Sequence, residues 1–184
     1  MEEQLLLWLH AHASPVLDAG FKLSHVVGNP PVMVSLALLM TLCHVVRRER
    51  DLAWLWAGLG LSTVVIQYVL KYSVLRARPE LWPRIVTQDG FSFPSGHALC
   101  AATLLPLLAI SLGRMQPRWA WPALCASIVL AAWIGLGRLY LGVHWPSDVV
   151  AGWTIGILQT TAAVRWVHRR DAAEEPEPRA KIVE

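Results

Sequence analysis

The chain has 184 residues, a length that suits one domain. Hydrophobic residues make up 55% of it and charged residues only 16%, which excludes an ordinary water-soluble globular protein of this size. The formal net charge of +3 is small, and the basic residues are dispersed among apolar segments. This pattern argues against a nucleic-acid-binding protein and favours a protein in contact with a membrane surface. The three cysteines lie inside apolar segments without metal-ligand spacing, so we interpret them as buried small side chains.

The first 28 residues are predicted to form two short amphipathic helices at the membrane surface. Ser14 is a favourable N-cap, Pro15 suits a first helical turn, and Asp18 is an early carboxylate. Gly28 suits the end of the second helix. The polar residues between positions 10 and 18 interrupt any apolar run long enough to form an additional span.

Five apolar segments follow, and each predicts a membrane-spanning helix. They cover residues 31–46, 52–70, 98–112, 119–136 and 149–167. A bilayer core of ~30 Å needs roughly 17–25 apolar residues as helix, so the second, fourth and fifth segments are long enough and the other two need flanking residues. We therefore expect an all-α fold, a polytopic integral membrane helical bundle of about five transmembrane helices. Residues 1–170 would form a single membrane-embedded domain, and residues 171–184 a disordered cytoplasmic tail.

The distribution of cations predicts the orientation of this bundle. With five spans, ten of the 16 lysines and arginines fall on one side of the membrane and six on the other. Cytoplasmic loops carry the excess of positive charge, so the richer side and the C-terminus are expected to be cytoplasmic. The connections at residues 71–97 and 138–148 then share the opposite, extracytoplasmic face.

Three polar clusters interrupt the apolar chain on that face, and the first contains Lys71 and Arg78, followed by Pro79. Seven residues span nearly two turns of a continued helix, so both cations would point the same way. Pro79 disfavours helix at Arg78 and turns the chain away. Arginine offers a fork for phosphate oxygens and lysine a point charge. Cations that merely cap a span are the alternative, although these two lie on the side with fewer positive charges.

The second cluster, Pro94-Ser95-Gly96-His97, precedes the third apolar segment. It would place the backbone N–H groups of Ser95, Gly96 and His97 at a helix N-terminus, which favours anion binding. A plain helix cap at Ser95 is the structural alternative. His97 weighs against that alternative, because a cation near the positive end of a helix dipole is unfavourable unless an anion offsets it.

The third cluster holds Arg138, His144 and Asp148 between the fourth and fifth apolar segments. Asp148 can accept a hydrogen bond from one imidazole nitrogen of His144 and leave the other free as a nucleophile. Taken alone, this pair would serve equally well as a structural contact. Together the clusters supply cations, a nucleophile with its orienting carboxylate, and a second histidine for the leaving group, which is the set that metal-free phosphoryl transfer needs.

The combined pattern Lys71-x6-Arg78-Pro79, Pro94-Ser95-Gly96-His97 and Arg138-x5-His144-x3-Asp148 resembles the three-part signature of the type 2 phosphatidic acid phosphatase family, whose superfamily also contains vanadium haloperoxidases. The resemblance covers residues 71–148. It implies that His144 attacks phosphorus to form a phosphohistidine, that Asp148 orients it, and that His97 protonates the leaving oxygen and then assists water. The implied phosphate-binding residues are Lys71, Arg78, Ser95, Gly96 and Arg138, with no metal or other cofactor.

The implied function is that of a small bacterial lipid phosphatase, a multi-pass protein of the inner (cytoplasmic) membrane with its active site on the periplasmic face. Its substrate would be a lipid phosphate monoester or pyrophosphate such as phosphatidylglycerol phosphate, phosphatidic acid or undecaprenyl pyrophosphate. A lipid phosphotransferase using the same site is one alternative. A haloperoxidase conflicts with the multi-span hydrophobicity, and a non-enzymatic lipid-binding protein would not need the paired histidines.

Several further positions carry weaker predictions. Gly137 stands where the family often has serine, so we expect a hydroxyl contact near the phosphate to be missing, with a modest effect. Gln67 lies one turn before Lys71 and is interpreted either as a pocket residue or as a packing residue. His10, His12, His25 and His44 are expected to be surface or packing residues.

Overall fold

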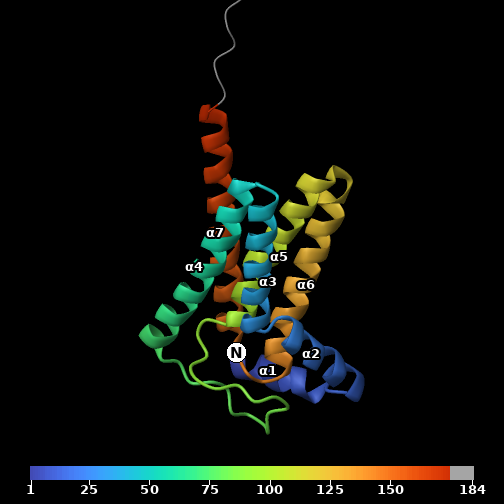
Figure 1. Ribbon diagram of the computed structural model, residues 1–184. Helices are drawn as coiled ribbons and strands as arrows, with labels where there is room; N and C mark the ends of the chain where they lie inside the picture. Colours follow the sequence, from blue (N-terminus) through green and yellow to red (C-terminus); the bar gives the residue numbers. More distant parts are fainter. Residues whose placement is uncertain (175–184) are drawn as a thin grey trace, which may run out of the picture.

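Figure 1 shows the computed structural model, a bundle of helices with two short helices and a long loop gathered at one end. It describes residues 1–174, except the side chains of residues 167, 168 and 170–174. The helices are α1 (Glu2–Ala11), α2 (Pro15–Val27), α3 (Pro30–Val46), α4 (Arg50–Val74), α5 (Gly96–Met115), α6 (Ala120–Tyr140) and α7 (Pro146–Glu174), with a 3₁₀ turn, η1 (Pro117–Trp119), before α6. The described residues contain no β-strand, so the all-α prediction is confirmed.

The five apolar segments correspond to α3, α4, α5, α6 and α7. Among residues 1–174, three units can cross a membrane by length and composition: Arg50–Val74, Gly96–Met115 and Pro117–Tyr140. A fourth is possible if α2 and α3, which meet at a 45° bend, form one broken span. The membrane-spanning bundle is thus confirmed, but these criteria support three or four spans rather than five. The third apolar segment gains the length it needs by beginning at Gly96, ahead of the apolar run.

Two predicted spans fall short for different physical reasons. Helix α3 has only 17 residues. Helix α7 carries polar side chains that face its neighbours, and its Gln159 donates to Thr63 Oγ1 (2.9 Å) and Thr103 Oγ1 (2.6 Å) and accepts from Ser62 Oγ (3.0 Å). These bonds satisfy the amide inside the bundle, where an unpaired polar group would be unfavourable.

The two predicted N-terminal helices are present as α1 and α2, which lie across the lower end of the bundle in Figure 1. Ser14 caps α2 by accepting from the backbone N–H of Leu17 (3.4 Å), Pro15 begins the helix and Gly28 follows its end. The predicted disordered tail, residues 171–184, is wrong for its first four residues, because α7 continues to Glu174. Residues 175–184 lie outside the described part of the chain.

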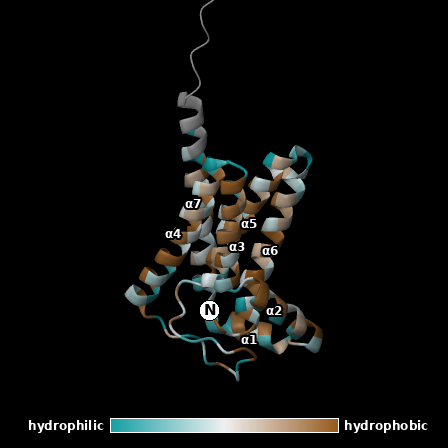
Figure 2. Ribbon diagram, in the orientation of Figure 1, coloured by the Kyte–Doolittle hydropathy of each residue, from teal (hydrophilic) through white to brown (hydrophobic). Residues whose placement is uncertain are grey.

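Helix α5 is the central helix, and every residue from Gly96 to Leu105 is buried. It packs against α3, α4, α6 and α7. The outward surfaces of the surrounding helices are apolar, whereas polar residues concentrate at the ends of the bundle (Figure 2). Large exposed side chains on these surfaces include Leu38, Leu42, Leu61, Val65, Val129 and Leu158. This distribution suits helices that face lipid rather than water.

Close packing of α5 on α7 depends on two glycines one turn apart, Gly152 and Gly156. A Cβ on Gly152 would lie 2.7 Å from the carbonyl oxygen of Ser95, and one on Gly156 would lie 2.8 Å from Cβ of Ala102 and 2.9 Å from the carbonyl oxygen of Leu99. Small residues at this spacing let membrane helices approach closely. The start of α5 is thereby held against the start of α7.

We predict that Gly156→Val destabilises the fold, since its side chain would meet the backbone of α5. Overpacking of this kind costs about 1–3 kcal/mol, so the midpoint of thermal unfolding in detergent should fall. Gly58→Ala is the matched control, because no atom lies within 4 Å of a Cβ at Gly58. In a helix interior alanine is favoured over glycine by up to about 1 kcal/mol, so the unfolding midpoint of Gly58→Ala should stay the same or rise. Equal midpoints for Gly156→Val and the parent protein would contradict this account of the α5–α7 interface.

Candidate functional site

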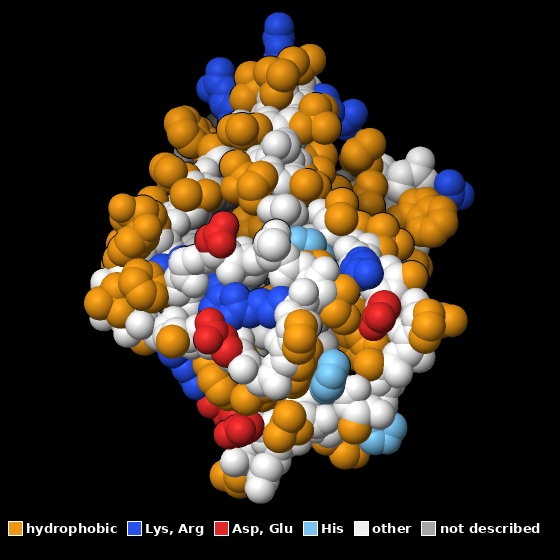
Figure 3. All heavy atoms as spheres, turned by 90° about the horizontal axis from the view of Figure 1, so that it is seen from below, with side chains coloured by type: hydrophobic (Ala, Val, Ile, Leu, Met, Phe, Trp, Pro, Cys, Tyr) orange, Lys and Arg blue, Asp and Glu red, His pale blue; other side chains and the backbone are white. Residues whose placement is uncertain are grey.

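The residues of the three polar clusters lie at the end of the bundle that carries α1, α2 and the loop after α4. Seen from this end, Lys and Arg side chains gather near the centre of the face, with acidic and histidine side chains around them (Figure 3). The clusters come from the end of α4, the start of α5, the end of α6 and the start of α7. Hydrogen bonds join each cluster to another.

Lys71 and Arg78 are brought together by a loop rather than by a helix face. Helix α4 ends at Val74, and Leu75 adopts a left-handed conformation (φ 54°), so the prediction that a continued helix aligns the two cations is wrong. Lys71 Nζ donates to the carbonyl oxygen of Phe91 (2.6 Å), and Arg78 NH2 donates to the same oxygen (3.1 Å). The shared acceptor places both cations beside the loop that precedes α5.

Arg78 also holds this loop in shape. Its guanidinium donates to the carbonyl oxygens of Asp89 (3.1 Å), Gly90 (2.9 Å) and Val143 (2.7 Å), and its NH1 donates to His144 Nε2 (3.1 Å). Burial lowers the pKa of Arg78 to about 10, and the nearby charge of Arg84 adds to this effect. Arg78 therefore remains a cation at neutral pH and links the first cluster to the third.

The second cluster forms the start of α5, as its sequence predicts. The helix begins at Gly96, and Ser95 is its N-cap, with Oγ 3.5 Å from the backbone nitrogen of Ala98. The backbone N–H of Ser95 donates to the carbonyl oxygen of Asp148 (3.0 Å), so the prediction that this N–H is free for an anion is wrong. The same bond joins the second cluster to the third.

Gly96 allows a side chain from α4 to approach the start of α5. A Cβ at this position would lie 2.2 Å from Oε1 of Gln67 and 2.6 Å from its Cδ. Of the two interpretations of Gln67, packing against this turn is the one that the contact supports. Any larger residue at position 96 would displace Gln67 or the turn.

Arg138 is fully buried in the last turn of α6. Its NH1 donates to His25 Nδ1 (2.7 Å) and lies 3.2 Å from His97 Nε2, whereas Nε and NH2 have no partner among the described residues. Buried donors are almost always paired, and an unpaired charged group is especially unfavourable. Two unpaired donor groups on one buried guanidinium therefore mark a place for an anion.

His144 and Asp148 lie together as a buried pair, with side chains 2% and 0% exposed. His144 Nδ1 is 3.4 Å from Asp148 Oδ2, within ion-pair distance but without an aligned hydrogen bond. Burial lowers the pKa of His144 to about 4, against the opposing effect of Asp148. The imidazole is thus neutral at physiological pH, and a neutral imidazole has a lone pair available for nucleophilic attack.

Three residues that the sequence did not mark as functional adjoin the site. His25, on α2, contacts both Arg138 and His97 (3.2 Å to Nε2), and its ring stacks on that of His97 with centroids 5.1 Å apart. Arg76 and Glu2 connect to Asp148. No motif signals His25 or Glu2, but Arg76 lies only two residues before Arg78, on the side of the membrane predicted to carry fewer cations, and that position is a signal that could have identified it.

The structure also shows what replaces the side chain at Gly137. A Cβ there would lie 2.2 Å from Ser24 Oγ and 3.1 Å from Phe21 Cδ1, both on α2. Ser24 is fully buried, and its hydroxyl donates to the carbonyl oxygen of Phe21 (2.8 Å). The space that a serine at position 137 would use is therefore filled by the hydroxyl of Ser24.

This arrangement has the chemistry of an oxyanion site. Arg138, with its unsatisfied donors, lies beside His97, Arg78 lies beside His144, and Lys71 shares an acceptor with Arg78. These contacts lie at the end of an apolar bundle, where electrostatic interactions are strong. Among the described residues, no group of three or more His, Cys, Asp or Glu side chains could hold a metal ion. The arrangement can stabilise the charge of a phosphoryl group through arginine and lysine alone.

Comparisons with known proteins agree with this geometry. The family model described as PAP2 superfamily matches residues 51–172. The chain is 36% identical over 111 residues to phosphatidylglycerophosphatase B of Bacillus subtilis, an alignment that covers 56% of this chain and 54% of that protein. It is 36% identical over 98 residues to undecaprenyl-diphosphatase of Sulfolobus acidocaldarius, covering 50% of this chain and 44% of that protein. These alignments span about half the length of the curated relatives.

The fold itself is shared over almost the whole chain. The crystal structure of a transmembrane PAP2 type phosphatidylglycerolphosphate phosphatase from Bacillus subtilis superposes with a TM-score of 0.81 at 24% sequence identity. The superposition covers 96% of this chain and 87% of that one. A superposition of this extent reaches beyond residues 51–172, which the family model matches, into the N-terminal helices.

We predict that Gly137→Ser, which restores the residue common in the family, is harmful in this chain. The new side chain would push α2 away from α6 and move His25, next to Ser24, away from Arg138. Overpacking should lower stability by about 1–3 kcal/mol, measured by thermal unfolding in detergent. Adding Ser24→Ala should recover most of this loss, because removing Oγ leaves Phe21 Cδ1 (3.1 Å) and Ser24 Cβ (3.4 Å) as the nearest atoms to the new Cβ. If Gly137→Ser is as stable as the parent, or if Ser24→Ala gives no recovery, then the Ser24 hydroxyl does not fill the space of a serine side chain at position 137.

Proposed function

The chain belongs to the PAP2 superfamily, and we propose that it is an integral-membrane lipid phosphatase that hydrolyses a phosphate monoester or pyrophosphate of a lipid. Residues 1–170 act as its single membrane-embedded domain. The observation that carries this proposal is Arg138, a fully buried cation beside His97 whose Nε and NH2 are unpaired in the part of the chain that the structure describes. A tetrahedral phosphoryl group would supply the acceptors that these donors lack.

In the first chemical step, His144 Nε2 forms a bond to phosphorus as the bond from phosphorus to the lipid oxygen breaks. His97 Nε2 gives its proton to that leaving oxygen. Asp148, 3.4 Å from His144 Nδ1, holds the proton on that nitrogen and stabilises the charge that develops on the ring. Arg138, Arg78 and Lys71 stabilise the equatorial oxygens, together with Ser95 Oγ and the backbone N–H of Gly96.

In the second step, water attacks the phosphohistidine. The water oxygen bonds to phosphorus, the bond to His144 Nε2 breaks, and His97 takes a proton from the water and so regains the one it gave up. Inorganic phosphate then leaves. Arg78 NH1, which donates to His144 Nε2 in the ligand-free structure, returns to that nitrogen. Each atom and proton is accounted for without a metal ion or another cofactor.

The surroundings of His97 support a lipid as the leaving group. His25, which contacts His97, lies on α2 among apolar side chains that face outward: Leu23 is 56% exposed and Val26 59%. A lipid whose phosphate reaches Arg138 could place its acyl or prenyl chain along this face. The substrate class we propose includes phosphatidylglycerol phosphate, phosphatidic acid and undecaprenyl pyrophosphate, and the names of the two relatives fit the first and the last of these.

We further propose that the site faces the periplasm from the inner membrane. The turn between α3 and α4 and the turn between α5 and α6 lie at the opposite end of the bundle and carry several exposed arginines. These are Arg47, Arg48, Arg50, Arg114 and Arg118. Cytoplasmic loops are enriched in such cations, which supports a cytoplasmic position for that end.

The test is phosphate release from those three lipids by the detergent-solubilised protein. His144→Ala should abolish turnover while thermal unfolding remains cooperative, because the nucleophile is lost without loss of the cation site. Acid-quenched protein should carry phosphate on histidine in the parent but not in His144→Ala. Vanadate should inhibit as a pentacoordinate mimic, and chelation of divalent ions should have no effect.

Three results would count against the mechanism: full activity of His144→Ala, strict dependence on Mg²⁺, and the absence of any histidine-linked phosphate. Transfer of the phosphoryl group to an added lipid alcohol in preference to water would instead identify a phosphotransferase. Binding of all three lipids without phosphate release would point to a non-enzymatic lipid-binding protein.

A further inference from the structure

A chain of ionic contacts links the N-terminal helix to the candidate nucleophile. Glu2 Oε2 accepts from Arg76 NH2 (2.7 Å), and Arg76 NH1 donates to Asp148 Oδ1 (2.8 Å). Asp148 then reaches His144 through its other oxygen, Oδ2, 3.4 Å away. Neither Glu2 nor Arg76 belongs to the phosphatase signature or touches the place of the phosphate.

Arg76 fixes the rotation of the Asp148 carboxylate. Oδ1 receives Arg76, and Oδ2 receives the backbone N–H of Trp145 (2.8 Å), so each oxygen has a donor of its own. Asp148 has no exposed surface, and a buried carboxylate without these donors would be costly to keep ionised. Loss of Arg76 would leave Oδ1 unpaired and allow the carboxylate to turn away from His144.

Arg76 is itself held from several directions. Its NH1 also donates to Ser147 Oγ (2.6 Å), and its guanidinium lies over the ring of Trp145, 5.5 Å from the centroid. Glu2 completes the arrangement, because its Oε1 accepts from the backbone N–H of Ser147 at the start of α7 (2.8 Å). Burial raises the pKa of Glu2, but the bonds from Ser147 and Arg76 outweigh it and hold that pKa below its ordinary value.

The rest of α1 is anchored firmly enough to place Glu2. Leu6 is fully buried and packs in a cluster with Ala98 and Val149, at the starts of α5 and α7. The ring of His10 stacks on Trp82 with centroids 4.2 Å apart. Glu2 therefore reaches α7 from a fixed helix.

We propose that Glu2 and Arg76 are positioning residues for the pair Asp148–His144, so that docking of α1 sets the geometry of the nucleophile. This inference rests on the proposed function. Helix α1 then has a role in the chemistry, although it lies far from the signature residues in the sequence.

The first test compares Arg76→Gln, Arg76→Lys and Glu2→Gln in phosphate release from short-chain phosphatidic acid in detergent. Arg76→Gln should lower kcat by ~10–100-fold with little change in KM, as for other residues that orient a reacting group. Arg76→Lys should restore part of kcat. Glu2→Gln keeps an acceptor for Ser147 but loses the charge, so its effect should be smaller and should largely vanish in the Arg76→Gln background.

Arg84→Gln is the matched control, since Arg84 lies in the same loop with similar exposure (26% against 29% for Arg76) and pairs with Glu80 instead. It should leave kcat unchanged. The second test observes ring-¹⁵N signals of the histidines in the ligand-free protein, with those of His144 identified by their loss in His144→Ala. Arg76→Gln should shift the His144 Nδ1 signal and Arg84→Gln should not.

The two measurements separate this inference from the proposed function. Unchanged kcat and an unchanged His144 signal in Arg76→Gln would each overturn the positioning role. A shifted signal in a protein that releases no phosphate would retain the positioning role and remove the phosphatase assignment.

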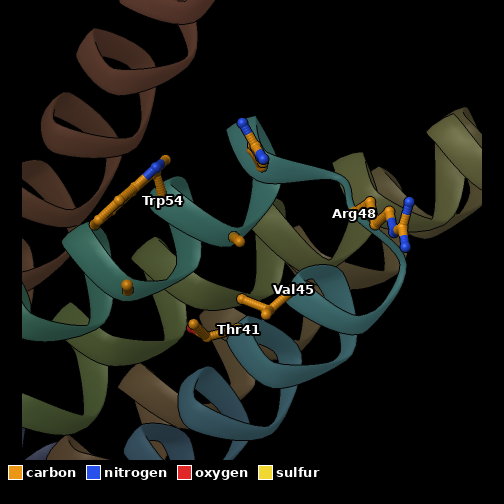
Figure 4. Close-up of a pocket in the computed structure, with 7 residues that line it drawn as sticks. Thr41, Val45, Arg48 and Trp54 are labelled. Atoms are coloured by element: carbon orange, nitrogen blue, oxygen red, sulfur yellow. The ribbon is translucent and has the colours of Figure 1, made fainter.

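The end of the bundle opposite the candidate site carries a groove. A groove of about 580 Å³ lies between the end of α3 and the start of α4, bordered by Thr41, Val45, Arg48 and Trp54, with Arg50, Ala53 and Ala57 completing its lining (Figure 4). Its walls are apolar apart from Thr41 and the two arginines at its rim. Trp54 is 74% exposed, as is common for residues at the membrane interface.

The two arginines of the groove differ from the neighbouring charged residues in their ion pairing. Glu49 pairs with Arg47 (2.9 Å) and His44 (2.6 Å), and Asp51 pairs with Arg114. Within the described residues, Arg48 and Arg50 have no carboxylate partner. We infer that the groove binds an anionic phospholipid of the bilayer, whose headgroup phosphate meets these arginines while an acyl chain lies between α3 and α4.

The test measures thermal unfolding in a neutral detergent with added phosphatidylglycerol or phosphatidylcholine. Phosphatidylglycerol should raise the unfolding midpoint by a few degrees more than phosphatidylcholine does. The double substitution Arg48→Gln/Arg50→Gln should remove that difference, and Ala57→Leu, which fills the groove without changing charge, should reduce it. Arg118→Gln, an exposed arginine at the same end, should retain it. A full difference in the double variant, or an equal loss in Arg118→Gln, would exclude a specific site.

Discussion

The arrangement of this protein depends on keeping a charged guanidinium, that of Arg138, inside the end of an apolar bundle. Its burial is complete, and within the described part of the chain only NH1 has hydrogen-bond partners. Such a group is unfavourable in the ligand-free state, and the surrounding structure must hold it there. His25 does so by accepting a hydrogen bond from NH1, and His97 Nε2 lies 3.2 Å from the same nitrogen, which requires α2 and α5 to meet at the last turn of α6. The unpaired nitrogens Nε and NH2 then face the proposed anion site, where they would stabilise a bound anion most strongly.

Helix packing in the apolar part of the molecule sets the geometry of the polar end. The glycines of α7 bring it so close to α5 that the backbone of Ser95 bonds to that of Asp148. The N-cap of α5 and the first turn of α7 therefore lie side by side, although Ser95 and Asp148 are 53 positions apart in the sequence (148 − 95). Arg78 ties the intervening loop to both His144 and the chain beside it. The geometry of the proposed phosphoryl site, which is assembled from helix ends, thus depends on uncharged packing contacts.

The sequence was sufficient for the fold class, the helical segments and the residues of the signature, because hydropathy and motif spacing are local properties. The sequence was insufficient for contacts that depend on the path the chain takes after a helix ends. Lys71 and Arg78 meet through the carbonyl of Phe91, not along a helix, since Leu75 turns the chain. The N–H of Ser95 was assigned to an anion, but tertiary packing gives it to a carbonyl oxygen. Neither outcome could be read from spacing.

Position 137 shows most clearly why the N-terminal helices belong to the site. From the motif alone, Gly137 predicts that a hydroxyl group is missing from the site. In the structure, the hydroxyl of Ser24 on α2 occupies that space. The residue after Ser24 is His25, which bonds to Arg138, so the small residue on α6 is what lets α2 deliver a histidine to the buried cation. Glu2 of α1 reaches Asp148 through Arg76 in a comparable way. Two helices that the signature does not include therefore contact both the proposed anion-binding residues and the proposed nucleophile pair.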